Sequence, residues 1–299
     1  MAALEVSGRD DPRLDDPALL ALILGPGGTG GAARLAFWQA ATLGQAAPDP
    51  ALERRLAGDI LALMGRYPAD RLAQLRGPML SRAASALRAD RRAANGPLDG
   101  AVEVSEWAHP FRGFFAVEVA DLRHRRFAGG MTGPIRREMF VATDAVTVLP
   151  YDPLRDRVLL VEQFRAGPLA RGEARPWLIE AVAGRIDAGE TPEQAARREA
   201  AEEAGIALGA LIPVADYYPS PGAMTEYLYS YVALADLPEG TGGLHGLESE
   251  GEDIRTHVIP FDQAMRWMAE GRLANAPLIL SLFWLARERE RLRGTARGL

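Results

Sequence analysis

The feature that most constrains this chain is one stretch that carries a helix start, a helix end and a row of acids. Residues 184–206 read GRIDAGETPEQAARREAAEEAGI. Thr191 followed by Pro192 is typical of a helix N-terminus, where the hydroxyl caps the first turn and proline loses no hydrogen bond. Gly205 is typical of the residue that ends a helix. The stretch therefore predicts a helix over 192–204.

The acids of this helix are spaced to share one face. Glu199, Glu202 and Glu203 stand at i, i+3 and i+4, and Glu190 lies in the loop just before the cap. Crowded carboxylates repel one another unless cations lie between them. Oxygen ligands select hard ions such as Mg²⁺. Such an ion also coordinates phosphate oxygens of a substrate and lowers the pKa of a water bound to it. The face is therefore a candidate Mg²⁺ anchor for a diphosphate.

A simpler interpretation is a solvated acidic face, in which Arg198 pairs with Glu202 one turn away. Arg198 is also expected to orient Glu190 in the loop. Gly184, Glu190 and Gly205 flank these acids, and an ordinary acidic helix requires none of the three.

The whole stretch fits the pattern G-x5-E-x7-R-E-U-x-E-E-x-G-U, with U an apolar residue, without a gap. By this pattern the chain resembles the Nudix hydrolases. Ala200 fills an apolar position that many members give to a larger aliphatic residue, and we interpret it as closer helix packing. The resemblance implies a mixed α/β (α+β) fold, the Nudix α/β/α sandwich, in which a sheet lies between helices.

The composition excludes several other chemistries. Cysteine is absent and all 34 basic residues are arginines, which excludes disulfides, thiolate catalysis and Schiff-base lysines. Without lysine, the glycine-rich residues 25–31 are not a Walker A loop. A net charge of −6 without a basic block argues against a nucleic-acid surface. The scattered histidines are interpreted as structural: His109, His124, His245 and His257.

Targeting signals are not evident. A membrane helix needs an apolar run of about 18 residues, and no run in the chain approaches that length. Its first residues also lack the basic segment and apolar core of a signal peptide. Together with the absence of cysteine, this predicts a cytoplasmic protein without a membrane partner.

The chain divides by pattern into three parts. Residues 1–98 are rich in Ala, Leu and Arg and predict a helical extension of four or five short helices, without a catalytic group. Residues 99–143 predict a small antiparallel-strand subdomain, and residues 144–299 the Nudix domain. The predicted strands are 114–120, 123–127, 137–141, 145–149, 158–161, 178–183, 211–217, 227–233 and 255–259. The predicted closing helices are 261–270 and 277–293.

Two motifs outside the acidic stretch narrow the resemblance to ADP-ribose pyrophosphatases. Residues 217–226 read YYPSPGAMTE, which places Pro221 and Gly222 in the S-P-G-x-x-x-E setting of that branch. Residues 243–255 read GLHGLESEGEDIR, which is similar to its acidic catalytic loop. The similarity runs from about residue 102 to about residue 284.

The resemblance implies a role for each matching residue. The implied metal ligands are the carbonyl of Ala183 and the side chains of Glu199, Glu202, Glu203 and Glu252. The implied catalytic residues are Glu250 as general base, with Glu202, Arg198 and Glu190. The implied substrate residues are Arg137 and Arg165 for the phosphates, Glu226 for ribose hydroxyls, Phe114 for adenine, and Pro221 with Gly222. Which of Glu250 and Glu252 is the base stays open.

The resemblance implies Mg²⁺-dependent hydrolysis of ADP-ribose to AMP and ribose 5-phosphate, with Mn²⁺ as a substitute ion. It also implies a homodimer, because the segment before the main domain exchanges strands between subunits in this branch; residues 101–143 match that segment. Two alternatives remain. One is the same chemistry on another nucleoside diphosphate sugar or a dinucleotide. The other is a non-catalytic ADP-ribose-sensing module, which the full set of glutamates in residues 184–206 disfavours.

Overall fold

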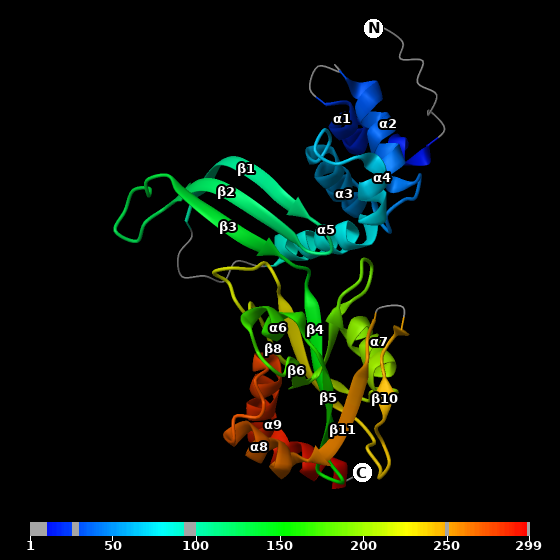
Figure 1. Ribbon diagram of the computed structural model, residues 1–299, viewed down its shortest axis with the longest axis vertical. Coiled ribbons are helices and arrows are strands. Elements are labelled where there is room, and N and C mark those ends of the chain that lie inside the picture. The colour runs from blue at the N-terminus through cyan, green and yellow to red at the C-terminus, as the bar shows by residue number, and fades with distance from the viewer. Residues whose placement is uncertain (1–10, 26–29, 93–99, 249–250, 298–299) are drawn as a thin grey trace. The chain divides into compact units, whose positions relative to one another are not determined.

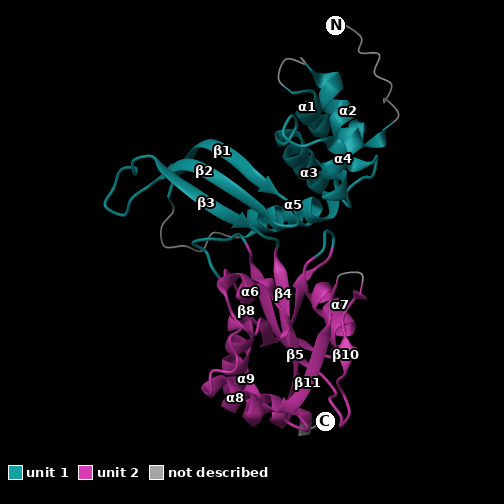
Figure 2. Cartoon of the chain, in the orientation of Figure 1, with its two compact units in different colours: residues 1–143, 187–189, 220–225 teal, residues 144–186, 190–219, 226–299 magenta. Residues whose placement is uncertain are grey.

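The computed structural model describes residues 11–25, 30–92, 100–248 and 251–297. The chain divides into two compact units, which Figure 2 distinguishes by colour. The first unit comprises residues 1–143, 187–189 and 220–225, and the second comprises residues 144–186, 190–219 and 226–299. The proposed parts 1–98 and 99–143 both fall in the first unit, and their independence as domains stays a prediction.

Short helices form the start of the first unit. They are the 3-10 turn η1 (Pro12–Asp15), α1 (Pro17–Leu24), α2 (Gly31–Thr42), α3 (Pro50–Ala62), α4 (Ala69–Gln74) and α5 (Arg76–Arg91) (Figure 1). Asp16 caps α1 and Asp49 caps α3, and each is followed by proline at the first helical position. Their apolar sides enclose Trp38 and Leu56, which are fully buried. The predicted run of short helices is therefore present.

A three-stranded antiparallel sheet completes the first unit, in the order β1 (Val102–Arg112), β2 (Ala116–His124) and β3 (Ile135–Val141). Strand β1 was not predicted, because its pairing with β2 is irregular at two places and this breaks the alternation that marks a strand. The predicted strand at 123–127 is wrong. Strand β2 ends at His124, and Gly129 and Gly130 turn the chain at positive φ.

The second unit is built on a mixed eight-stranded sheet. Its strands are β4 (Ala145–Asp152), β5 (Arg157–Phe164), β6 (Trp177–Glu180), β7 (Val182–Arg185), β8 (Leu211–Tyr217), β9 (Leu228–Leu234), β10 (Leu244–His245) and β11 (Ile254–Pro260). The order is β10-β11-β5-β4-β9-β8, with β6 paired to β5 and β7 to β4. Strands β4 and β9 run parallel. The predicted single strand 178–183 is thus two strands with different neighbours.

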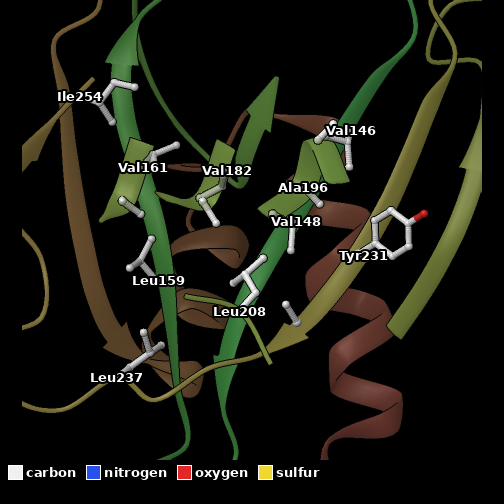
Figure 3. Packing of buried hydrophobic residues seen from close by; sticks show 14 of the residues in the cluster. Val146, Val148, Leu159, Val161, Val182, Ala196, Leu208, Tyr231, Leu237 and Ile254 are labelled. Atoms are coloured by element: carbon white, nitrogen blue, oxygen red, sulfur yellow. The ribbon is translucent and has the colours of Figure 1, made fainter. Parts of the chain in front are cut away.

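Helices cover both faces of this sheet. They are α6 (Ala166–Arg171), α7 (Pro192–Ala204), α8 (Phe261–Ala269) and α9 (Ala276–Arg297). Alternate residues of β4 and β5 explain the layers: Val148 and Val161 pack toward α7, and Leu149 and Leu160 pack toward α8 and α9. Figure 3 shows the cluster on the α7 side, which includes Val148, Val161 and Ala196. The predicted sheet between helices is confirmed.

The predicted helices 192–204, 261–270 and 277–293 correspond to α7, α8 and α9. Helix α6 was not predicted, because six residues containing a glycine and a proline carry no helical periodicity. No helix in the described residues is both long enough and apolar enough to cross a membrane.

Asp156 ties the β4–β5 turn to α9. It accepts hydrogen bonds from Tyr151 at 2.8 Å and from Arg289 at 2.9 Å, and it forms an ion pair with Arg293. Burial alone would raise the pKa of Asp156, but these hydrogen bonds outweigh it and lower the pKa to about 2. The turn and the helix are therefore held together by a carboxylate that stays ionised.

Replacing Asp156 with Asn should lower the free energy of unfolding by about 2 kcal/mol at pH 7, at about 1.4 kcal/mol per unit of pKa shift. In the wild type this contribution is present above the unfolded pKa of 3.8 and is lost as the pH falls toward about 2. Urea unfolding of both proteins between pH 2 and pH 7 measures the difference. A gap that stays constant across this range would show that Asp156 stabilises the turn without its charge.

Candidate active site

Helix α7 begins and ends where the local signals predict. The hydroxyl of Thr191 accepts from the N–H of Gln194, and the side chain of Gln194 accepts from the N–H of Thr191. Gly205 ends the helix in the left-handed conformation, with φ of 64°. Fully buried alanines, including Ala196 and Ala200, pack against the sheet. The small side chain of Ala200 is fully buried between the helix and the sheet.

Two glutamates of α7 turn inward along strand β7. Glu199 and Glu203 are buried residues, with 9% and 2% of their surface exposed. A Cβ added to Gly184 would lie 1.9 Å from the carboxylate of Glu199, so only glycine leaves room for it. Glu203 accepts hydrogen bonds from the N–H of Ala183 at 3.0 Å and from the side chain of Gln163 at 3.3 Å. Both carboxylates therefore contact strand β7, Glu199 at Gly184 and Glu203 at Ala183.

Arg198 connects the remaining acids. Its guanidinium donates to Glu190 at 2.9 and 3.0 Å, to Glu199 at 2.7 Å and to Glu202 at 3.0 Å. It also donates to the carbonyl of Arg185 at 2.9 Å. Among the described residues, no three acids or histidines converge closely enough to hold a metal ion. Arg198 instead supplies the positive charge between the acids in this arrangement, and the roles of these residues as ligands stay predictions.

Burial acts on both inward carboxylates. It raises the pKa of Glu199 to about 7, against the opposing charge of Arg198, and the nearby charges of Glu202 and Glu252 raise it further. It raises the pKa of Glu203 to about 8, with Glu199 adding to the effect. Ionising these groups is costly unless a cation compensates. These carboxylates offer only oxygen ligands, and their negative charges outnumber the one positive charge of Arg198. Such a set of ligands fits a hard divalent ion.

Metal binding at these carboxylates should release protons. Because Glu199 and Glu203 have pKa values of about 7 and about 8, an ion that binds them at pH 7 should displace about one proton or more, and fewer at pH 9. Affinity for Mg²⁺ should therefore rise with pH over this range. Calorimetric titration in buffers of different ionisation enthalpy counts the protons, with Glu203→Gln as a control that should release fewer.

The sign of the stability effect is opposite to that of Asp156. Unfolded glutamates lose their protons near pH 4.5, whereas the folded groups keep theirs up to about 7 and about 8. The metal-free protein should thus lose stability as the pH rises through this window. A melting temperature that is flat from pH 5 to pH 9 without metal would contradict the raised pKa values.

Arg165 and Glu226 lie in the same unit as these glutamates. Arg165 donates to Glu180 at 2.7 Å, and the other oxygen of Glu180 accepts from Asn275 at 2.8 Å. Burial raises the pKa of Glu226, and the charges of Arg165 and Arg185 oppose the rise. Arg165 is also an electrostatic neighbour of Glu203. Arg165, one of the two predicted phosphate residues, is therefore an electrostatic neighbour of both Glu203 and Glu226.

The sequence prediction missed two residues that hold others in place, Gln163 and Glu180. Each is 5% exposed and lies beside an apolar run, residues 158–161 for Gln163 and residues 177–179 for Glu180. A polar residue beside an apolar run is the signal that points to such positions, because burial without a partner is costly.

Other predicted residues lie in the first unit. Arg137 is exposed on β3, and its side chain donates to the carbonyl of Arg136 at 2.9 Å. Phe114 is exposed and stacks edge-to-face on Phe115 with 4.9 Å between ring centroids. Pro221 and Gly222 are exposed and belong to the segment 220–225, which the first unit includes. These residues thus belong to a different compact unit from α7.

The acidic loop is described in part. Glu250 lies outside the described residues. Glu252 accepts a hydrogen bond from the N–H of Leu247 at 3.3 Å and donates its own N–H to the carbonyl of Leu247 at 3.2 Å. Its charge contributes to the raised pKa of Glu199, so the predicted fifth ligand lies near the carboxylates of α7.

Comparison with known proteins identifies relatives of this chain. The chain is 42% identical over 183 residues to an ADP-ribose pyrophosphatase of Escherichia coli K12, across 61% of this chain and 87% of that protein. It is 39% identical over 177 residues to an ADP-ribose pyrophosphatase of Haemophilus influenzae, across 58% and 81%. It is 36% identical over 166 residues to a GDP-mannose pyrophosphatase of Pectobacterium atrosepticum, across 55% and 82%.

A solved structure described as an ADP compounds hydrolase shares the fold, with a TM-score of 0.50 and 23% identity over 66% of this chain and 96% of that one. The NUDIX domain model matches residues 141–281, which include all of α7 and its flanking loops. Since the chain spans most of the length of relatives at this identity and carries the glycine–glutamate pattern on a capped helix, it belongs to the NUDIX family.

Proposed function

We propose that this protein hydrolyses the diphosphate bond of ADP-ribose to give AMP and ribose 5-phosphate, with Mg²⁺ or Mn²⁺ held by the glutamates of α7. The observation that carries the proposal is the pair of buried carboxylates, Glu199 and Glu203, resting on β7 beside Gly184. The ADP-ribose pyrophosphatases among its relatives support the choice of substrate.

A bound divalent ion would supply positive charge to the diphosphate and lower the pKa of the attacking water. Glu199 and Glu203 would hold the ion, with Glu202, Glu252 and the carbonyl of Ala183 as further ligands. The oxygen of water bonds to one phosphorus, the bond from that phosphorus to the bridging oxygen breaks, and the bridging oxygen keeps the electron pair. Glu250 would accept the proton of the water.

Arg198 would keep Glu190 and Glu202 in place beside the ion, as its hydrogen bonds in this structure support. Arg165 would donate to phosphate oxygens from the orientation that Glu180 gives it. Glu226 would accept hydrogen bonds from the ribose hydroxyls.

The residues of the first unit would act in a cytoplasmic homodimer, with Arg137 binding phosphate, Phe114 flanking adenine, and Pro221 and Gly222 lining the site. Exposed aromatic side chains on this unit, among them Phe111, Phe114 and Phe140, support an interface there.

A second candidate is the same hydrolysis on another nucleoside diphosphate sugar, because a GDP-mannose pyrophosphatase is among the relatives. Chromatography of products after incubation with Mg²⁺ and ADP-ribose, beside GDP-mannose, ADP-glucose and NADH, separates the candidates. AMP formed fastest from ADP-ribose supports the proposal, and faster turnover of another compound changes the substrate. Binding of ADP-ribose without any turnover would favour the sensing module.

A further inference from the structure

Gly205, which ends α7, and the acidic loop of residues 243–255 meet at His245. Strand β10 brings His245 against Gly205, where an added Cβ would lie 2.8 Å from Cε1 of the imidazole and 3.3 Å from Nδ1. Gly205 therefore meets two demands, a φ of +64° that ends α7 and the absence of a side chain where the imidazole packs. The contact joins the end of α7 to the start of the loop.

The next residue extends this contact toward Glu252. The N–H of Gly246 donates to the carbonyl of Glu202 at 3.4 Å, one of the carbonyls that a helix end leaves without an internal partner. A Cβ on Gly246 would lie 2.9 Å from the Cβ of Glu252 and 3.0 Å from its carbonyl oxygen. Leu247 then exchanges two hydrogen bonds with Glu252. A continuous path of short contacts thus leads from α7 to the carboxylate of Glu252.

These contacts hold the loop against the repulsion between Glu252 and the glutamates of α7. Glu252 stands close enough to raise the pKa of Glu199, and Glu202 adds a second like charge. Like charges drive the loop away from the helix when no cation lies between them. The imidazole Nε2 of His245 is buried and has no hydrogen-bond partner among the described residues, so the ring holds the loop by its shape.

We infer that His245 is a positioning residue, which docks the acidic loop on the end of α7 and thereby holds Glu252 beside Glu199. The inference rests on the proposed function only for the role of Glu252 as a metal ligand. The docking itself is independent of catalysis and is measurable in the metal-free protein.

The first measurement is hydrogen–deuterium exchange of the metal-free protein and its His245→Ala variant. Peptides that cover residues 243–253 should exchange at least about tenfold faster in the variant, because the loop opens more often. Peptides from the middle of α7 should be unchanged. Equal exchange in the loop of both proteins would overturn the inference, as would an equal increase throughout α7, which would indicate a general loss of structure.

The second measurement asks whether His245 acts through Glu252. Calorimetry with Mn²⁺ should give dissociation constants raised about tenfold or more in His245→Ala and in Glu252→Gln. The double variant should be no weaker than Glu252→Gln alone, because the ring has nothing left to position. Losses that multiply in the double variant would overturn the inference. Neither readout requires turnover, so a protein without activity on ADP-ribose would contradict the proposed function and leave this test intact.

If His245→Ala does not fold, Gly205→Asn provides the same test from the opposite side. Asparagine tolerates the left-handed conformation, but its Cβ occupies the position of the imidazole. Faster exchange confined to residues 243–253 is again the expected result, and unchanged exchange there would overturn the inference.

Discussion

Replacing Glu199 with Gln should lower kcat for ADP-ribose by at least about a hundredfold, since even residues that only support metal ligands cost about 10- to 100-fold when lost. Glutamine has nearly the same shape and keeps the contact with Gly184, so the fold should be retained. It removes the charge that a hard cation requires, at a position only 9% exposed, where water cannot replace the lost ligand.

The matched control is Glu193→Gln, the same change in the first turn of the same helix. Glu193 is exposed, stands six positions before Glu199, and accepts a hydrogen bond from the hydroxyl of Tyr231 at 3.3 Å. Steady-state kinetics measures kcat of both variants, and their melting temperatures report on the fold. If the melting temperatures are equal, the lower kcat of Glu199→Gln is assigned to the site. If Glu199→Gln turned over ADP-ribose at the wild-type rate, the metal role of α7 would be wrong.

Replacing Arg198 with Ala should move the acidic limb of the pH–rate profile to higher pH. Burial sets the raised pKa of Glu199, and Arg198 is the largest influence that opposes it. Without that charge the pKa should rise above about 7, so metal would bind the ionised carboxylate only at higher pH. Glu190 and Glu202 would also lose their shared donor, and we expect kcat/KM at pH 7 to fall by about a hundredfold or more.

Arg197→Ala is the neighbouring control. Arg197 donates to the carbonyls of Leu208 and Gly209, so its hydrogen bonds hold the segment that follows α7. Its loss should change stability and leave the pH profile of kcat/KM in place. An identical profile for Arg198→Ala and the wild type would show that Arg198 serves only to hold the helix.

Local signals explain why α7 was predictable to the residue. The hydroxyl of Thr191, the ring of Pro192 and the free backbone of Gly205 act within one turn of their own positions, so nothing distant is needed to interpret them. The spacing of the glutamates then follows from the helical repeat. The fold class followed from the resemblance to the Nudix hydrolases, and the predicted strands on either side of this helix agreed with it.

Other features depend on contacts that sequence spacing does not carry. Strand β1 was missed because its irregular pairing with β2 hides the alternation, and the single predicted strand at 178–183 divides at Ala181 because β6 and β7 pair with different neighbours. Glu180 holds Arg165 with the help of Asn275, which lies 95 positions away in the chain. Such pairs are set by tertiary packing and have no local pattern.

The alanines of α7 have a consequence for the dimensions of the site. Because every buried apolar residue of this helix is an alanine, Ala196 and Ala200 among them, the helix axis lies near the strands. Glutamate side chains have only three rotatable bonds to cover the distance to β7, and at this separation those of Glu199 and Glu203 reach it. One layer of methyl groups thus sets the distance between the helix and β7, and with it the position of both carboxylates.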